Sequence, residues 1–276
     1  MAKLFSVVSW NVEHFRDDPQ RIADVLALLR KQKPDVFALY EVEGSTVFEP
    51  LMASMPGYAF QITEGAQTQE ILVGVKRTFS AFITQRTEFR SGTTAMRPGQ
   101  LVTLRIGGVN TMLLFLHLAS GNDPRGMGLR DDMLERAFDF RGVLDKAAGG
   151  RGQARYMFIG DLNTMGLAYP FGHDIAASAE LQKWDRFASR ASVGMRRLVK
   201  THDASWSNGS GSSLAPSNLD HVYASNNLRF RTWPRADGGE AEVALRGWVD
   251  EPTDAKKDAW ITRYSDHALM YFEVQA

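Results

Sequence analysis

The stretch A-R-Y-M-F-I-G-D-L-N-T, residues 154–164, decides the fold and supplies the first functional signal. Residues 156–159 form a short apolar run with aromatic and β-branched side chains, which is typical of a buried strand. Asp161 and Asn163 follow Gly160 at the predicted exit of that strand. A carboxylate accepts a proton and a carboxamide donates a hydrogen bond, so the two side chains can act on one ligand. Gly, Asp and Asn are also ordinary turn residues, so this stretch alone leaves both interpretations open.

The composition is that of a globular protein with a large core. The 276 residues are 44% hydrophobic and 23% charged. The absence of cysteine excludes disulfides, thiol catalysis and cysteine-based zinc sites. Thirty-two Lys and Arg balance 32 Asp and Glu, so no overall basic field attracts nucleic acid, although a local basic patch would serve.

The N-terminal sequence M-A-K-L-F-S-V-V-S-W-N runs directly into a strand pattern and lacks the features of a signal peptide. No window reaches the ~18 apolar residues of a membrane span. We therefore expect a cytoplasmic protein without membrane insertion, and secretion after removal of a leader stays open. No protein partner is inferred, and a monomer is expected.

Strand patterns recur along the whole chain and outnumber helix patterns. We expect strands over residues 4–10, 36–40, 58–63, 70–76, 79–87, 100–106, 109–118, 156–159, 219–224, 228–232 and 267–274, and helices over 18–33, 45–55, 129–147 and 174–188. Residues 205–217 predict an exposed, mobile loop, and residues 234–262 an irregular region with a strand within 241–247. This order predicts an α/β fold, a four-layer α/β-sandwich of two mainly antiparallel sheets packed face to face with helices outside. No linker or repeat interrupts the pattern, so residues 1–276 are expected to form a single domain.

Polar side chains gather at the predicted strand ends. Because the exit of one antiparallel strand adjoins the entry of its neighbour, these groups can meet on one rim. Carboxylate and carboxamide oxygens suit Mg²⁺ or Mn²⁺, and histidine beside a carboxylate suits proton transfer near neutral pH. The set therefore predicts hydrolysis of a phosphate ester. Its members are Asn11, Glu41, His117, Asp161 and Asn163 at exits, and Asp220, Asp266 and His267 at entries.

The chain resembles the endonuclease/exonuclease/phosphatase superfamily, which has the fold of pancreatic deoxyribonuclease and the exonuclease III-type abasic-site endonucleases. Each matching motif is short, but together they occur in the order and spacing of that superfamily between residues 4 and 274. The motifs are S-W-N (9–11), P-D-V-F-A-L-Y-E-V-E (34–43), H-L (117–118), G-D-L-N (160–163), N-L-D-H-V-Y-A-S (218–225) and S-D-H (265–267).

The resemblance implies a Mg²⁺ or Mn²⁺ cofactor and assigns roles around it. Asn11 and Glu41 match the metal-binding pair, and Asp266 matches an auxiliary ligand of metal or water. Asp161 matches the carboxylate that orients and deprotonates the attacking water. Asn163 matches the amide that holds the phosphate or the water.

Two histidines acquire catalytic roles in the same way. His267 matches the imidazole that acts on the scissile phosphate, with Asp220 as the carboxylate that orients it. His117 matches the second histidine of the deoxyribonuclease branch, the proposed general acid. Glu70 is a candidate carboxylate partner for His117.

Substrate contacts are expected from Arg97, in R-P-G-Q-L-V, and from Trp206, in the loop before Asp220. Arg125 and Arg130 are further candidates for phosphates that flank the cut. Arg97 is equally well explained as a solvated loop charge. The chain also departs from the family pattern at Glu43, the second acidic residue after Glu41, because deoxyribonuclease-like members often have a basic side chain there that touches DNA.

These roles indicate a metal-dependent nuclease that hydrolyses DNA phosphodiesters by in-line attack of water. One alternative is a phosphatase or a lipid or small-molecule phosphodiesterase of the same fold. Sphingomyelin-cleaving relatives need an exposed apolar hairpin, and the sequence does not suggest one. A catalytically idle binding module is the other alternative, disfavoured because every position of the set retains a functional side chain.

Overall fold

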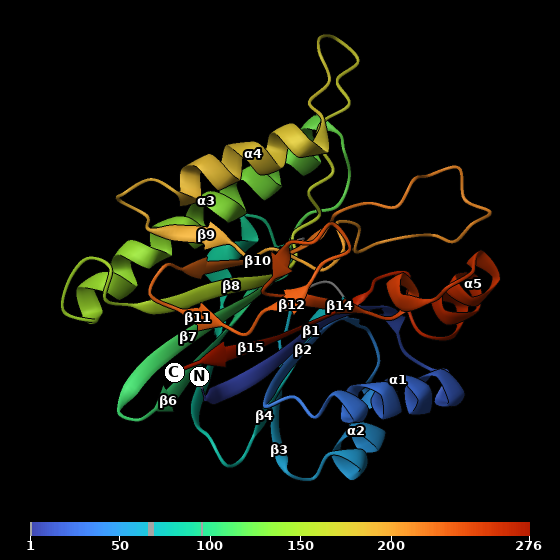
Figure 1. Ribbon diagram of the computed structural model, residues 1–276, viewed down its shortest axis with the longest axis horizontal. Helices are drawn as coiled ribbons and strands as arrows, with labels where there is room; N and C mark the ends of the chain where they lie inside the picture. Colours follow the sequence, from blue (N-terminus) through green and yellow to red (C-terminus); the bar gives the residue numbers. More distant parts are fainter. Residues whose placement is uncertain (1, 66–68, 95) are drawn as a thin grey trace.

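Two β-sheets packed face to face form the centre of the molecule, as the computed structural model shows for residues 2–65, 69–94 and 96–276 (Figure 1). The first sheet has the strand order β11-β15-β1-β2-β4-β3, and β14 pairs with β15. Its strands are β1 (Lys3–Phe15), β2 (Val36–Val42), β3 (Tyr58–Ile62), β4 (Glu70–Lys76), β11 (Arg229–Phe230), β14 (Ala244–Arg246) and β15 (Leu269–Gln275).

The second sheet has the order β5-β6-β7-β8-β10-β9. Its strands are β5 (Ser80–Arg86), β6 (Gly99–Ile106), β7 (Val109–His117), β8 (Arg155–Asp161), β9 (Met195–Arg197) and β10 (Asp220–Ser225), while β12 (Trp233–Pro234) and β13 (Glu240–Ala241) form a separate small ribbon. Each large sheet contains one parallel pair, β1–β2 and β7–β8, among antiparallel neighbours. The predicted fold class is therefore confirmed, with sheets that are mixed and mainly antiparallel.

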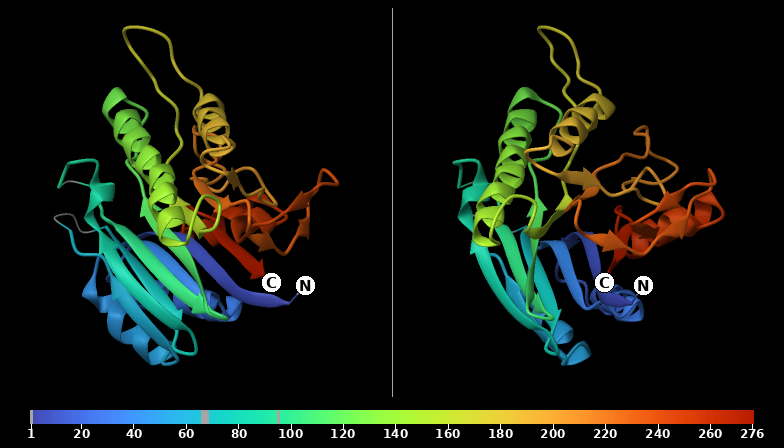
Figure 2. Two further views of the ribbon diagram at one scale, coloured as in Figure 1. Left: turned by 90° about the vertical axis from the view of Figure 1, so that its left-hand side faces the viewer. Right: turned by 60° about the vertical axis from the view of Figure 1, so that its left-hand side comes forward.

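Helices cover the outer faces of both sheets, so the chain forms four layers (Figure 2). α1 (Pro19–Gln32) and α2 (Phe48–Ser54) cover the first sheet; α3 (Pro124–Ala147) and α4 (Ala177–Ala188) cover the second. α1 buries Ile22, Val25 and Leu29, which recur at helical spacing in its sequence. On the other side, Phe138 of α3 meets Phe158 of β8 edge to face at 4.9 Å between ring centroids.

The inner faces of the two sheets share one apolar core, which fixes how their strand ends align. Tyr40 of β2 lies in this core with Phe115 and Ile159 of the second sheet. The Tyr40 hydroxyl donates to the backbone oxygen of Ile159 at 3.2 Å. This hydrogen bond connects the two sheets one residue before Glu41 and two residues before Asp161. It therefore fixes the relative position of the strand ends that carry these two residues.

Several element boundaries differ from prediction because capping and tertiary contacts override local pattern. α3 begins at Pro124 because Asp123 caps it, and α4 begins at Ala177. β1 continues to Phe15, past the predicted end at residue 10. The region 234–262 is more regular than predicted, since it holds α5 (Asp254–Arg263) as well as β14.

Two loops also differ from expectation. Residues 205–217 are not free at their ends, because Trp206 forms isolated bridges with Ser217 and His267. The expectation that the chain has no exposed apolar hairpin is wrong, because Leu167 and Ile175, between β8 and α4 in the chain, pair antiparallel and Phe171 beyond them is 87% exposed. None of the helices in the described part of the chain has the length and apolar character needed to span a membrane.

Candidate active site

The strand ends converge on one rim. On the second sheet, Asp161 is the register partner of both His117 on β7 and Asp220 on β10. Gly160 allows this close pairing, because its φ of +151° is open mainly to glycine and a Cβ there would lie 1.9 Å from the Leu116 backbone oxygen. The geometry therefore brings together residues that lie more than a hundred positions apart in the sequence.

Asp161 lies at the centre of the rim. Its Oδ2 accepts a hydrogen bond from Asn11 Nδ2 at 3.0 Å and lies 3.6 Å from His117 Nε2 and 3.8 Å from His267 Nε2. Its Oδ1 accepts from the backbone N–H of Asn163 at 3.1 Å. Burial raises the pKa of Asp161 to about 7, although the nearby His267 opposes that shift. A carboxylate with this pKa can exchange a proton near neutral pH.

His267 and Asp220 form a buried pair from opposite sheets. The His267 ring, held by Nδ1 at 2.8 Å from Asp220 Oδ2, turns Nε2 toward Asp161 and Asp266. Burial alone would lower the pKa of His267, but the carboxylates of Asp220 and Asp161 outweigh it and raise that pKa to about 10. The imidazole is thus protonated at neutral pH and suited to bind an anionic oxygen.

The second histidine differs in charge from the first. His117 Nε2 lies 3.7 Å from Glu41 Oε1, and its Nδ1 has no hydrogen-bond partner among the described residues. Burial, followed by the positive charges of Arg97 and His267, lowers the pKa of His117 well below its usual range. The predicted partner Glu70 is buried, and its carboxylate accepts a hydrogen bond from the Thr63 hydroxyl.

The predicted metal ligands lie on the same rim. Asn11 Nδ2 also donates to Glu41 Oε1 at 3.0 Å, and Asn11 Oδ1 accepts from the Glu13 backbone at 3.0 Å. Asp266 Oδ2 accepts from the Trp206 indole at 2.6 Å, so Trp206 touches the rim through Asp266. Glu41 has a φ of +61° and Asn163 one of +49°, conformations that are uncommon outside glycine and cluster at functional sites.

The donor set fits a divalent cation. Glu41, His117 and Asp161 each offer a ligand atom within 4.8 Å of the others. Burial raises the pKa of Asp266 as well as that of Asp161, and nearby carboxylates add to both shifts. The rim thus concentrates negative charge on oxygen ligands, the preferred environment of Mg²⁺ and Mn²⁺.

The predicted arginines separate into two groups. Arg97 is held beside the site through Gln69, whose backbone oxygen accepts from its Nε at 2.9 Å. Burial lowers the pKa of Arg97, and the carboxylates of Glu41 and Asp161 oppose that shift. Arg130 does not face substrate: it is fully buried and paired with Glu180 at 3.0 Å. Arg125 is exposed.

The structure adds Glu13, His14 and Lys200, to which the sequence motifs assigned no role at the site. Glu13 Oε2 accepts from the Asp266 backbone at 3.3 Å, and its position two residues after Asn11 is the signal that could have indicated it. His14 contacts Glu43 at 2.5 Å, and with Glu41 these form a second group that could hold a cation. Lys200, a buried lysine outside any motif, donates to the backbone oxygen of Asp220 at 2.7 Å.

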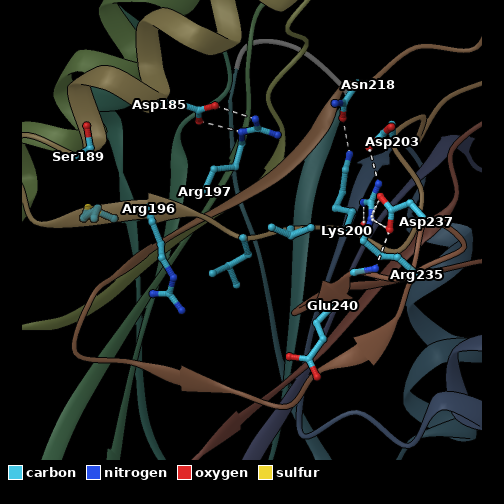
Figure 3. Close-up of a pocket in the computed structure, with 14 residues that line it drawn as sticks. Asp185, Ser189, Arg196, Arg197, Lys200, Asp203, Asn218, Arg235, Asp237 and Glu240 are labelled. Atoms are coloured by element: carbon cyan, nitrogen blue, oxygen red, sulfur yellow. Dashed lines mark hydrogen bonds and ion pairs between the residues drawn. The ribbon is translucent and has the colours of Figure 1, made fainter.

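Lys200 also lines a polar cavity of about 600 Å³ (Figure 3). Several of its charges are paired within the wall: Arg197 binds Asp185 through two hydrogen bonds of 2.8 and 2.7 Å, and Arg235 bonds Asp237. Lys200 also donates to Asn218 at 2.5 Å. None of the predicted catalytic or metal-binding residues lines this cavity, so the rim and the cavity are separate features.

The fold and the rim together define the class of this protein. It is a four-layer α/β-sandwich that carries acidic, amide and imidazole side chains at one rim. The chain belongs to the Endonuclease/Exonuclease/phosphatase family, because the model of that family matches residues 8–267. Members of this family are phosphoesterase hydrolases. No curated protein matches the chain.

Solved structures with the same fold include truncated TDP2 from Caenorhabditis elegans, at a TM-score of 0.69 and 19% identity, covering 99% of this chain and 97% of that one. TDP2 from D. rerio, complexed with single strand DNA product, has a TM-score of 0.65 and 18% identity, with 99% of each chain covered. A mannosyl-6-phosphatase from Bacteroides thetaiotaomicron has a TM-score of 0.60 and 14% identity, covering 99% of this chain and 100% of that one. At these identities the likeness shows the fold alone.

Proposed function

We propose that the chain is a metal-dependent phosphodiesterase that cleaves nucleic acid, with DNA as its substrate. The observation that supports this most strongly is the contact of Asp161 with Asn11, His117 and His267 on one rim. Membership of the family supports phosphoester hydrolysis. The choice of nucleic acid is supported by the D. rerio TDP2 structure, whose bound product is single-stranded DNA.

The roles follow from charge and position. Asp161 orients the attacking water and accepts its proton, because it has a pKa of about 7 and lies between the two histidines. Protonated His267, positioned by Asp220, and the amide of Asn163 bind the phosphoryl oxygens as negative charge develops. His117 is neutral in this environment, so we assign it hydrogen bonding to substrate in place of general acid catalysis.

Asn11, Glu41 and Asp266 would hold Mg²⁺ or Mn²⁺. The bound cation would neutralise part of the charge on the phosphate and on the carboxylates around it. Asn11 would offer its amide oxygen by rotation of the carboxamide, since the nitrogen now faces Glu41 and Asp161.

A substrate panel tests the proposal. Duplex DNA, single-stranded DNA, RNA, bis(p-nitrophenyl) phosphate and p-nitrophenyl phosphate are incubated with Mg²⁺, with Mn²⁺ and with EDTA. We expect cleavage of DNA and of the diester, loss of both in EDTA and recovery with added metal. Full activity of metal-free protein in EDTA would remove Asn11 and Glu41 from their assigned role.

Variants show whether the observed activity belongs to this rim. Asp161→Asn is nearly isosteric and should lower kcat by about 10²–10⁴, the usual scale for a general base. Asp139→Asn, on the exposed side of α3, should leave kcat unchanged. Brisk turnover of the monoester without cleavage of any diester would instead favour a phosphatase of the same fold.

A further inference from the structure

An extended arm, residues 166–176, leaves the body of the molecule between β8 and α4. It is the olive-yellow loop that projects beyond α4 in Figure 1 and beyond α3 and α4 in both views of Figure 2. Its root is built from reciprocal backbone hydrogen bonds of 2.8 Å between Leu167 and Ile175. The two sides of the root approach closely at Gly166, where a Cβ would lie 2.2 Å from the Ile175 backbone oxygen.

The tip of the arm presents two aromatic rings that contact each other. Residues 169–172 form a turn in which Gly172 N–H donates to Tyr169 O at 3.3 Å. The Tyr169 and Phe171 rings meet edge to face at 6.1 Å between centroids and an interplanar angle of 80°. Phe171 is 87% exposed and Tyr169 is 40% exposed. Single exposed apolar residues are common, but two neighbouring exposed aromatic rings at the end of an arm indicate a binding surface.

The arm is coupled to the candidate active site through its root. Gly166 follows Asn163 by three residues, and its N–H donates to Glu180 Oε2 at 2.7 Å. Arg130, buried and paired with Glu180, donates to the Gly166 backbone oxygen at 2.9 Å. A ligand held by the tip is therefore kept in a defined relation to the rim.

Chemistry favours unpaired nucleic acid over a membrane as the occupant. Lys and Arg are absent from residues 156–182 and the arm carries Asp174, so His173 is its one ionisable group that could become positive toward anionic lipids. Two aromatic rings also offer little area for insertion into a bilayer. Base stacking needs only an accessible ring face, together with cations for the backbone. The backbone oxygen of Asn122 accepts from Ala168 N–H at 2.6 Å, which joins the start of α3 to the root of the arm. The exposed Arg125 follows Asn122 by three residues and so lies near the root.

We propose that Tyr169 and Phe171 form a stacking platform for unpaired bases of the substrate strand, several nucleotides from the scissile phosphate. This inference rests on the proposed function and extends it to a preference for single-stranded segments. Because the arm projects away from the rim, a short oligonucleotide in the site does not reach the platform, whereas a long one does.

Binding is measured on the full chain carrying Asp161→Asn, by fluorescence anisotropy of labelled deoxythymidine 4-mers and 20-mers. Adding Phe171→Ala should weaken 20-mer binding roughly 10-fold, since stacking on one aromatic side chain contributes on the order of 1–3 kcal/mol per base. Binding of the 4-mer should not change, and Phe171→Trp should restore 20-mer affinity. Phe82→Ala is the matched control, because Phe82 is 71% exposed on β5, outside the arm.

Unchanged 20-mer affinity in Phe171→Ala would overturn the platform. A loss confined to binding of phosphatidylcholine vesicles would also overturn it and would assign the arm to lipid. Failure of the proposed function is distinct, because it would appear as no metal-dependent DNA cleavage by the wild-type chain, whatever residue stands at 171. Cleavage by the wild type with no effect of Phe171→Ala would remove only the platform.

Discussion

Asp220, the first residue of β10, and His267, which precedes β15, connect the two sheets. Asp220 Oδ2 lies 2.8 Å from His267 Nδ1. Two further contacts fix the histidine: its N–H donates to the Ser265 hydroxyl at 3.0 Å, and its backbone oxygen accepts from the Trp10 indole at 2.9 Å. The ring is thus held from both sides. Asp220 controls which ring nitrogen faces the site and stabilises the protonated ring.

This geometry predicts that Asp220 and His267 act as a unit. Asp220→Ala and His267→Ala should each lower kcat by about 10²–10⁴, and the double variant should be no slower than the slower single. The measurement is kcat on a diester with Mg²⁺, with folding checked by circular dichroism. Asp220→Ala combined with Asp139→Ala, which lies on α3, should equal Asp220→Ala alone. A double variant as slow as the product of the two singles would break the pairing.

Lys200 donates a hydrogen bond to the backbone oxygen of Asp220, and its contribution to the free energy of unfolding depends on pH. Burial lowers the pKa of Lys200 to about 7 from 10.5, although the negative charges of Asp220 and Asp203 oppose this shift and Arg197 adds to it. Between these two pH values the unfolded chain holds a proton that the folded chain lacks. The contribution of Lys200 to the free energy of unfolding therefore rises with pH in this window and is flat below about 7.

Urea unfolding at several pH values tests the charge state of Lys200. Relative to Lys200→Met, the wild type should gain roughly 1 kcal/mol in the free energy of unfolding for each pH unit between about 7.5 and 9. Lys31→Met, on the exposed side of α1, serves as the control and should show no such pH-dependent difference from the wild type. Parallel pH profiles for wild type and Lys200→Met would mean that Lys200 stays charged in the folded state.

At the level of elements, the β7–β8 pair fixes the position of Asp161. Gly160 opposes Leu116 in this parallel register, and a side chain there meets backbone that cannot move without opening the sheet. Gly160→Ala should lower the free energy of unfolding by at least about 3 kcal/mol. Gly142→Ala, within α3 and with open space around its Cα, should change stability by about 1 kcal/mol or less and in the stabilising direction. Denaturant titrations of both variants compare the two, and equal stability would show that the backbone around residue 160 adapts.

Elements with a clear apolar period were predictable from the sequence, and elements without one were not. α1 has a cap at Asp18, proline at its first position and a buried stripe, so its bounds were nearly correct. α5 fully buries none of its residues, and only Trp260 and Ile261 pack partly buried against the core, so its apolar period is too short to predict a helix without the cap at Thr253. Tertiary bridges of Trp206 similarly hold a segment whose Ser- and Gly-rich composition predicts a free loop.

The rim was predictable as a set of residue types, whereas its pairwise contacts were not. Asp161 and Asp220 lie together because they are paired on neighbouring strands, and His267 joins them because the packing of the two sheets brings their strand ends to one rim. The sequence could not distinguish a rim arginine from a buried one, since Arg130 and Arg97 both lie in polar segments and only packing buries Arg130 against Glu180. For the same reason, the sequence could not show that Thr63 donates a hydrogen bond to Glu70.

The whole molecule has a formal net charge of zero, so attraction of a polyanion depends on local cations. The rim itself is acidic, which repels phosphate unless a divalent cation is bound. With Arg130 paired inside the protein, Arg97 and Arg125 are the cations that remain from those predicted to contact phosphates. Electrostatic attraction should therefore be modest for a nuclease.

Salt dependence of kcat/KM on duplex DNA measures how many phosphates the protein neutralises. Each one contributes about −0.9 to the slope of the log–log plot, so we expect a slope of roughly −2 to −4. Arg97→Ala should flatten it by about one, equally for different DNA sequences, since a phosphate contact carries no base information. Arg151→Ala is the control, because Arg151 is exposed before the start of β8, at the end opposite Asp161, and should leave the slope unchanged. A slope near zero on DNA together with fast hydrolysis of a small phosphate ester would transfer the assignment from nuclease to phosphatase, because a small ester engages one phosphate and releases few counterions.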